Sequence, residues 1–149
     1  MTLIIAEAGV NHNGDMGLAR ELIAIAAEAG ADMVKFQTFT ASKIASASAP
    51  KAGYQLAATG AEQSQQEMLA MLELSRGDHE LLLRACEDAG IAFFSTGFDE
   101  AAIDLLIELG LDRLKVPSGE ITNLPLLRHM AGKGLPVIVS TGMANLGEI

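Results

Sequence analysis

Two lysines stand inside apolar segments of this 149-residue chain, Lys35 in MVKFQ and Lys115 in LKVPS. An ammonium group is costly to bury in an apolar strand unless it is paired. Either lysine alone is typical of a side chain that reaches solvent or pairs with a carboxylate for structural reasons. Two of them at corresponding places instead indicate a shared anionic ligand. Ammonium groups with nearby hydroxyls suit a small molecule that carries a phosphate and a carboxylate.

Further polar residues end the same kind of apolar run. They are Glu7, Gln37, Ser95, Thr96, Ser118, Glu120, Ser140 and Thr141. The two carboxylates, Glu7 and Glu120, can orient hydroxyl groups or transfer protons. The serines and threonines can bind a ligand, cap the helices that follow, or do both, and the sequence leaves these alternatives open.

A repeated unit must position these residues: a helical run ends at a glycine, and an apolar strand follows at once. The glycines, each suited to the left-handed conformation that closes a helix, are Gly30, Gly90, Gly110 and Gly134. Together with the opening segment LIIAEA, the pattern predicts strands at 3–8, 32–38, 91–96, 112–117 and 136–141. Strict alternation of strands and helices predicts an α/β fold with a parallel sheet.

About five parallel strands with four to five helices correspond to part of a (β/α)8 barrel, which needs roughly 250 residues to close. We therefore expect residues 1–149 to be the N-terminal half of such a barrel, truncated before closure. Ligands of these folds bind at the carboxyl ends of the strands, where the polar residues stand. Residues 39–63 are predicted to form a long loop. Predicted helix caps are Ser75, Asn123 and the pair Asn145 and Glu148.

Composition excludes several classes of function. A net charge of −9 with only ten scattered Lys and Arg residues argues against nucleic-acid binding. No apolar run is long enough for a membrane span, and the start lacks the basic region of a signal peptide, so we expect a cytoplasmic protein. Cys86 has no partner in the chain and is expected to pack as a small apolar group. The three histidines, His12, His79 and His129, do not predict a metal site.

Six separated segments resemble, in order, the N-acetylneuraminate (sialic acid) synthase family, which includes legionaminic and pseudaminic acid synthases. The segments are IIAEAGVNHNGDMGLARELI, AGADMVKFQTF, APKAGYQ, FFSTGFD, LKVPSGEITNLPLL and PVIVSTGMA. The resemblance implies a TIM barrel followed by a small antifreeze-like domain, in a homodimer. It also implies condensation of phosphoenolpyruvate with N-acetylmannosamine or a related acetylated amino sugar, which gives a nine-carbon 2-keto acid and phosphate.

The resemblance further implies roles for individual residues. The residues expected to hold phosphoenolpyruvate are Lys35, Thr96, Lys115, Ser118 and Ser140. Those expected to face the amino sugar are Glu7, Gln37 and Glu120, and Glu120 with Lys115 is expected to be catalytic. A divalent ion, manganese or magnesium, is implied to polarise the sugar aldehyde through two histidines of later strands, so this chain is expected to supply no metal ligand. The family usually has proline at the position of Gly97, which predicts a looser turn here.

Two alternatives remain beside this hypothesis. A half barrel can be a binding or assembly module without catalysis, in which two copies cover exposed strand edges. Another phosphoenolpyruvate-dependent 2-keto acid synthase would act on a sugar phosphate, and it would need a further basic cluster that this half does not show. In either barrel enzyme, we expect the present chain to be inactive by itself.

Overall fold

The structure is a computed structural model that describes residues 2–46, 49 and 64–149. Its strands are β1 (Ile5–Gly9), β2 (Met33–Thr38), β3 (Ala92–Gly97), β4 (Leu114–Val116) and β5 (Val137–Val139). β1, β2 and β3 form a parallel sheet in that order, and β4 pairs with β5 in a second parallel ladder. The strands lie where the sequence predicts them. The sequence predicts one parallel sheet, but the structure has two ladders. The short β4 lies beside β3 and yet forms its ladder with β5.

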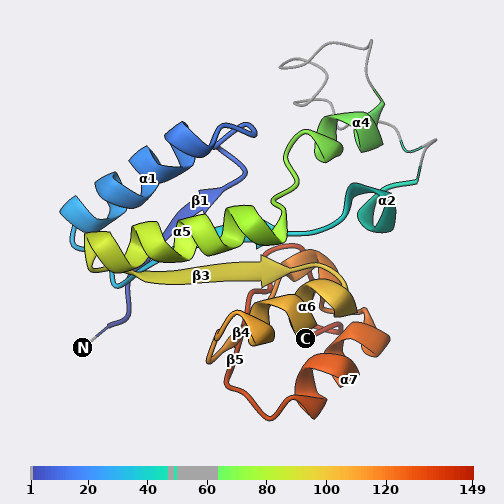
Figure 1. Ribbon diagram of the computed structural model, residues 1–149. Coiled ribbons are helices and arrows are strands. Elements are labelled where there is room, and N and C mark those ends of the chain that lie inside the picture. The colour runs from blue at the N-terminus through green and yellow to red at the C-terminus, as the bar shows by residue number, and fades with distance from the viewer. Residues whose placement is uncertain (1, 47–48, 50–63) are drawn as a thin grey trace.

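Helices connect each strand to the next. They are α1 (Met16–Glu28), α2 (Ala41–Ile44), α4 (Gln65–Ala70), α5 (Arg76–Ala89), α6 (Glu100–Glu108) and α7 (Leu124–Gly132), with a 3-10 turn, η1 (Ser118–Glu120). Figure 1 shows α1 and α5 side by side over the sheet of β1 to β3, while α6 and α7 lie with β4 and β5. The α/β architecture with parallel strands is confirmed, and the described strands do not close into a barrel.

The helix ends follow the predicted local chemistry. All four helix-closing glycines have positive φ angles, between 68° and 96°. Ser75 begins α5 with a capping box that includes Asp78, and Asn123 caps α7. Asn145 and Glu148 make the reciprocal hydrogen bonds of a capping box, of 2.8 and 3.2 Å. At Ser75 and Asn123 these side chains satisfy backbone N–H groups that a helix start leaves without partners. The residues after Asn145 form a turn and not the helix that its predicted cap implied.

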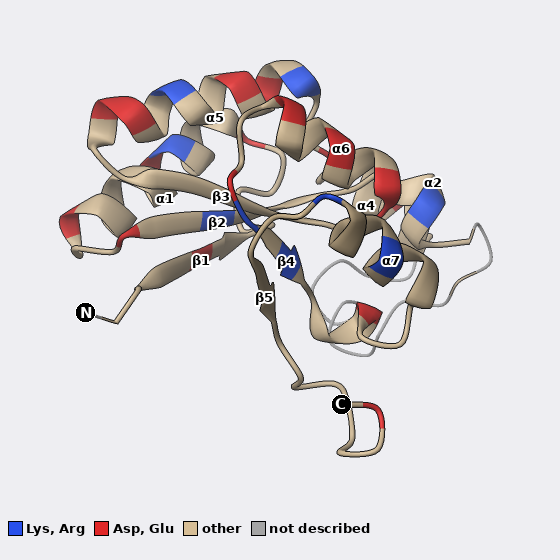
Figure 2. Cartoon of the chain, turned by 90° about the horizontal axis from the view of Figure 1, so that it is seen from below, with Lys and Arg blue, Asp and Glu red and all other residues tan. Residues whose placement is uncertain are grey.

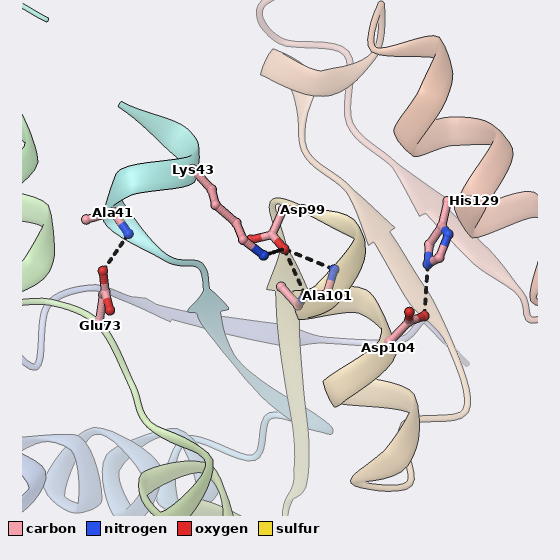
Figure 3. Close-up of polar contacts among 8 residues, drawn as sticks. Ala41, Lys43, Glu73, Asp99, Ala101, Asp104 and His129 are labelled. Atoms are coloured by element: carbon pink, nitrogen blue, oxygen red, sulfur yellow. Dashed lines mark hydrogen bonds and ion pairs between the residues drawn. The ribbon is translucent and has the colours of Figure 1, made fainter. Parts of the chain in front are cut away.

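The predicted long loop at 39–63 begins with a short helix, α2, which the sequence did not indicate. Residues 47–48 and 50–63 lie outside the described residues, and so does most of the segment APKAGYQ. Figure 3 shows how the chain after β2 is held: the Ala41 N–H donates to the Glu73 carboxylate, and Lys43 forms a 2.9 Å ion pair with Asp99. Asp99 also caps α6. This chain segment is thereby attached beside the carboxyl ends of β2 and β3.

Two apolar clusters stabilise the fold. The first joins β1 to β3 with α1 and α5 and includes the buried side chains of Phe36, Phe94 and Leu82. The second packs β4 against α6 and α7. Burial of one such large side chain stabilises the fold by roughly 1.5–3 kcal/mol. Cys86 lies in the first cluster, 1% exposed, and burial raises the pKa of its thiol to about 12, so its predicted packing role is confirmed.

Gly97 ends β3 in register with Thr38 and does not lie in a loosened turn. A Cβ atom at Gly97 would be 2.7 Å from Cδ1 and 3.1 Å from the backbone nitrogen of Ile103. The absence of a side chain therefore lets α6 approach the end of the strand closely. This differs from the turn expected from the sequence.

None of the helices within the described residues combines the length and apolar character that crossing a membrane requires.

Candidate active site at the carboxyl ends of the strands

Alternation along β2 separates two faces of the sheet. Val34 and Phe36 are buried in the cluster with α1 and α5. Because successive side chains of a strand point to opposite faces, Lys35 and Gln37 point away from those helices. Figure 2 shows that β2 and β4 each carry a basic segment and β1 an acidic one. The polar side chains thus gather on the face that would line the interior of a barrel.

A bulge in β1 directly follows the residue that gives this face its carboxylate. Glu7 pairs with Lys35 in the ladder, but the next pair joins Gly9 to Phe36, so Ala8 is an extra residue. Gly9 has a φ of 55°, and a Cβ atom there would be 3.1 Å from Glu7 Oε1 and 3.6 Å from Gln37 Nε2. Glu7 and Gln37 therefore approach the same space beside Gly9. Bulges of this kind commonly redirect side chains next to active sites.

Lys35 is bound to two of the other predicted site residues. Its Nζ lies 2.5 Å from Glu7 Oε2 and donates a 3.3 Å hydrogen bond to Thr96 Oγ1. The lysine side chain is only 12% exposed, whereas that of Glu7 is 52% exposed. Thr96 is fully enclosed and stands opposite Gln37 in the β2–β3 register. The arrangement compensates a nearly buried ammonium group with a carboxylate that still faces solvent.

Lys115 has a different set of partners. Its Nζ donates to the Ser140 hydroxyl oxygen at 2.6 Å and to the Val116 carbonyl oxygen at 2.7 Å. Within the described residues it forms no ion pair with a carboxylate, so both acceptors are neutral. Burial lowers the pKa of Lys115, the charge of Lys35 lowers it further, and Glu7 opposes these effects. The three groups therefore share one electrostatic environment with an excess of positive charge.

Ser118 and Glu120 lie in η1, directly after β4. Glu120 Oε2 accepts a 2.6 Å hydrogen bond from Asn123 Nδ2. No hydrogen bond or ion pair between described residues connects Ser118 or Glu120 to the two lysines. The structure thus brings together Glu7, Lys35, Gln37 and Thr96, and places Lys115 with Ser140 near them. It leaves Ser118 and Glu120 on the adjoining turn.

Sequence reasoning missed three features of this region. The first is the bulge at Ala8, for which the small pair Ala8–Gly9 is a weak signal. The second is Asn123 as the partner of Glu120; the spacing of three residues within one turn was a usable indication. The third is Ser95, which faces the helices and bonds the Thr38 hydroxyl at 2.7 Å. A ligand role for Ser95 does not follow from this orientation.

The described residues contain no group of three or more His, Cys, Asp or Glu side chains that could hold a metal ion. His12 is completely buried, its Nδ1 accepts a 3.1 Å hydrogen bond from the Gly14 N–H, and burial lowers its pKa. His129 contacts Asp104 between α6 and α7 at 2.8 Å, away from the strand ends (Figure 3). The described part of this chain therefore does not fit a divalent ion.

Comparison with known proteins shows which family the sequence matches. Residues 22–149 match the NeuB family. The chain is 57% identical over 98% of its length to N,N'-diacetyllegionaminic acid synthase of Legionella pneumophila and spans 41% of that protein. It is 56% identical over 99% of its length to the synthase of the same name from Campylobacter jejuni and spans 44% of it.

A solved structure extends the comparison to the fold. The N-acetylneuraminic acid (sialic acid) synthetase of Leptospira borgpetersenii superposes on 99% of this chain with a TM-score of 0.81 at 34% identity. The chain covers 47% of that structure, as well as less than half of each curated relative named above. The fold is therefore that of a partial TIM barrel of the sialic acid synthase type, and the chain belongs to the NeuB family.

Proposed function

We propose that the full-length protein, meaning this chain extended to the length of its relatives, condenses phosphoenolpyruvate with an acetylated amino sugar. The sugar is N-acetylmannosamine or a related diacetamido sugar, and the products are a nine-carbon 2-keto acid and phosphate. Membership of the NeuB family and the two relatives named N,N'-diacetyllegionaminic acid synthase support a sugar-acid synthase. The observation that carries the proposal is Lys115, which faces only neutral acceptors among the described residues beside the second ammonium group of Lys35.

Phosphoenolpyruvate is assigned to the side of the site that holds both lysines. A phosphate or carboxylate oxygen would give Lys115 the anionic partner that Val116 and Ser140 do not supply. A hydrogen bond to a charged group contributes roughly 1.5–3 kcal/mol. The hydroxyls of Thr96 and Ser140 are already bonded to lysines and can serve the same anion. We assign Ser118 to this ligand as well, from its place in the turn after β4.

The amino sugar is assigned to the space beside Gly9, where Glu7 and Gln37 meet. In the reaction, C3 of the enolpyruvate forms a bond with the aldehyde carbon of the sugar, whose oxygen takes up a proton. Water adds to C2, and the bond between C2 and the phosphate oxygen breaks to release phosphate. Glu120 is the residue that we assign to proton transfer or hydroxyl orientation at the aldehyde. The lysines stabilise the charge on the phosphate and carboxylate during these steps.

The divalent ion that the family resemblance implies would polarise the aldehyde. The described residues contain no cluster that could hold it, so its ligands are assigned to none of them. A homodimer and a cytoplasmic location are likewise part of the proposal.

Phosphate release tests the proposed reaction. The full-length protein is incubated with phosphoenolpyruvate, manganese and either N-acetylmannosamine or a diacetamido sugar, and the present chain is assayed in parallel. We expect sugar-dependent phosphate release from the full-length protein only. A folded full-length protein that releases no phosphate with any acetylated amino sugar would contradict the function. Turnover by the present chain alone would contradict the expectation that residues outside this chain supply essential parts of the site.

A further inference from the structure

A buried chain of hydrogen bonds crosses from α5 to the ends of β2 and β3. His79 Nδ1 lies 2.8 Å from the Ser75 carbonyl oxygen, and His79 Nε2 lies 2.8 Å from Thr38 Oγ1. Thr38 Oγ1 in turn lies 2.7 Å from Ser95 Oγ. The His79, Thr38 and Ser95 residues are 0%, 3% and 1% exposed. All three polar side chains are thus enclosed, and each is bonded to the next.

The Ser75 carbonyl oxygen fixes the direction of every hydrogen in this chain. A carbonyl can only accept, so His79 Nδ1 carries the hydrogen, and Nε2 of a neutral imidazole accepts from the Thr38 hydroxyl. Thr38 Oγ1 then accepts from the Ser95 hydroxyl. Burial lowers the pKa of His79, which favours this neutral form. The three side chains therefore have one mutually consistent arrangement.

The Ser75 carbonyl group, at which this series of hydrogen bonds begins, is held in a rigid position. Ser75 is the N-cap of α5, and its side chain and backbone are bonded to Asp78 in a capping box. The carbonyl that orients His79 is therefore part of the start of a 14-residue helix. Phe93 packs edge-on against the His79 ring, with centroids 6.2 Å apart, and limits its movement further.

Thr38 and Ser95, at the other end of this hydrogen-bond series, lie on the opposite face of the sheet from the proposed site. Thr38 follows Gln37 in β2, and Ser95 precedes Thr96 in β3, so the two hydroxyls stand on the opposite face from those site residues. Gln37 is paired with Thr96 in the ladder. A slip of one residue between parallel strands would exchange the two faces. The bond between Thr38 and Ser95 opposes such a slip at the point where Thr96 accepts from Lys35.

Apolar side chains would fill this interior without the cost of burying polar groups. Hydrophobic contacts have no direction, however, whereas hydrogen bonds fix both distance and angle. We infer that His79 is a positioning residue of the site: through Thr38 and Ser95 it sets the ends of β2 and β3, and with them Lys35, Gln37 and Thr96. The inference rests on the proposed function for its effect on phosphoenolpyruvate.

Substitution of Thr38 in the full-length protein tests the inference. Thr38→Val keeps the shape of the side chain and removes its hydrogen bonds, so we expect the Kd and KM for phosphoenolpyruvate to rise on the order of ten- to a hundredfold. Thr38→Ser restores the hydroxyl and is expected to return most of the affinity. Leu82→Val is the matched control. It alters a buried residue of α5 in the first apolar cluster and removes none of the hydrogen bonds between His79, Thr38 and Ser95. It should leave the Kd for phosphoenolpyruvate unchanged.

A second measurement keeps the inference separate from the proposed function. The Phe98 N–H donates to the Thr38 carbonyl oxygen at 3.2 Å, beyond the last ladder pair. We expect its hydrogen exchange to be faster in Thr38→Val than in Leu82→Val. Unchanged affinity or unchanged exchange in Thr38→Val would overturn the inference. Failure of the unsubstituted protein to bind phosphoenolpyruvate would instead contradict the proposed function, and the exchange measurement would still decide the positioning role.

Discussion

Asn123 donates from its amide nitrogen to Glu120 Oε2 at 2.6 Å, while its amide oxygen accepts from the Leu126 N–H at 3.4 Å. One side chain therefore caps α7 and orients the carboxylate that we assign to proton transfer. The start of the helix fixes which end of the amide faces Glu120, because only the oxygen can accept from a backbone N–H.

Substitutions at Asn123 separate these two roles. In the full-length protein, Asn123→Asp keeps a capping oxygen but places a second carboxylate beside Glu120. Because general acid–base catalysis contributes roughly a hundred- to ten-thousandfold, we expect kcat to fall at least about tenfold. Asn123→Ser keeps the cap, removes the donor and should show a smaller decrease. Thermal unfolding and the Kd for phosphoenolpyruvate serve as controls, and an unchanged kcat in Asn123→Asp would show that the contact does not serve the reaction.

Lys115→Ala should weaken phosphoenolpyruvate binding far more than sugar binding. The lost charge-assisted contact is worth roughly 1.5–3 kcal/mol, which corresponds to about a ten- to 150-fold rise in Kd. Calorimetric titration of the full-length protein measures this change. Lys133→Ala is a matched control, because Lys133 is paired with Asp104 at the far end of α7. Equal phosphoenolpyruvate affinity in the two variants would contradict the assignment of Lys115.

Alkaline pH should weaken phosphoenolpyruvate binding earlier than an ordinary lysine would predict. Burial and the charge of Lys35 lower the pKa of Lys115, so its ammonium group loses its proton below the usual value of about 10.4. The anion prefers the protonated form, and affinity therefore falls as pH rises through the lowered pKa. The pH dependence of the Kd, measured between about pH 7 and 10, should be flatter in Lys115→Arg, because a guanidinium stays charged throughout this range. The same pH dependence in both proteins would exclude Lys115 as its source.

Acid should destabilise the protein through its buried histidines. Burial lowers the pKa of His79 and His12 below the unfolded value of about 6.5, although the charge of Asp78 opposes both shifts. Below about pH 6.5 the unfolded state binds more protons, so the free energy of unfolding decreases as pH falls. Urea denaturation at pH 7.5 and 5.5 measures the decrease. His79→Gln should reduce the difference between the two pH values, and an unchanged difference would exclude His79 as a contributor.

Gly97→Ala should destabilise the full-length protein by roughly 1–3 kcal/mol, because the added methyl group would collide with Ile103. Gly132→Ala is the matched control at the end of α7, where a Cβ atom would meet nothing within 4 Å. Alanine is the better helix former, so this change should be neutral or stabilising by up to about 1 kcal/mol. Urea denaturation compares the two. Equal stability of both variants would show that α6 can move away from β3 without cost.

The sequence predicts those parts of the fold that depend on neighbouring residues. Gly90 closes α5 because a left-handed residue must end the helix there, and the apolar run that follows forms β3. The alternation of side chains along β2 places Lys35 and Gln37 on the face opposite the helices. This much of the site follows from period and position alone.

Contacts between distant strands are not predictable in this way. The hydroxyl bond from Thr38 to Ser95 depends on the register of β2 against β3, which local periodicity does not fix. The division of the sheet depends on β4 forming its ladder with β5. Glu120 shows the same limit, because its partner is decided by the geometry of a 3-10 turn.

The bulge at Ala8 changes the phase of β1 inside the strand itself. Up to Glu7 the residues of β1 pair one to one with those of β2. After the bulge the pairing resumes one residue later, at Gly9. The turn at residues 10–14 therefore lies on the far side of the bulge from the Glu7–Lys35 pair. One extra residue thus separates the register of the Glu7–Lys35 pair from the tightly packed turn that holds the buried His12.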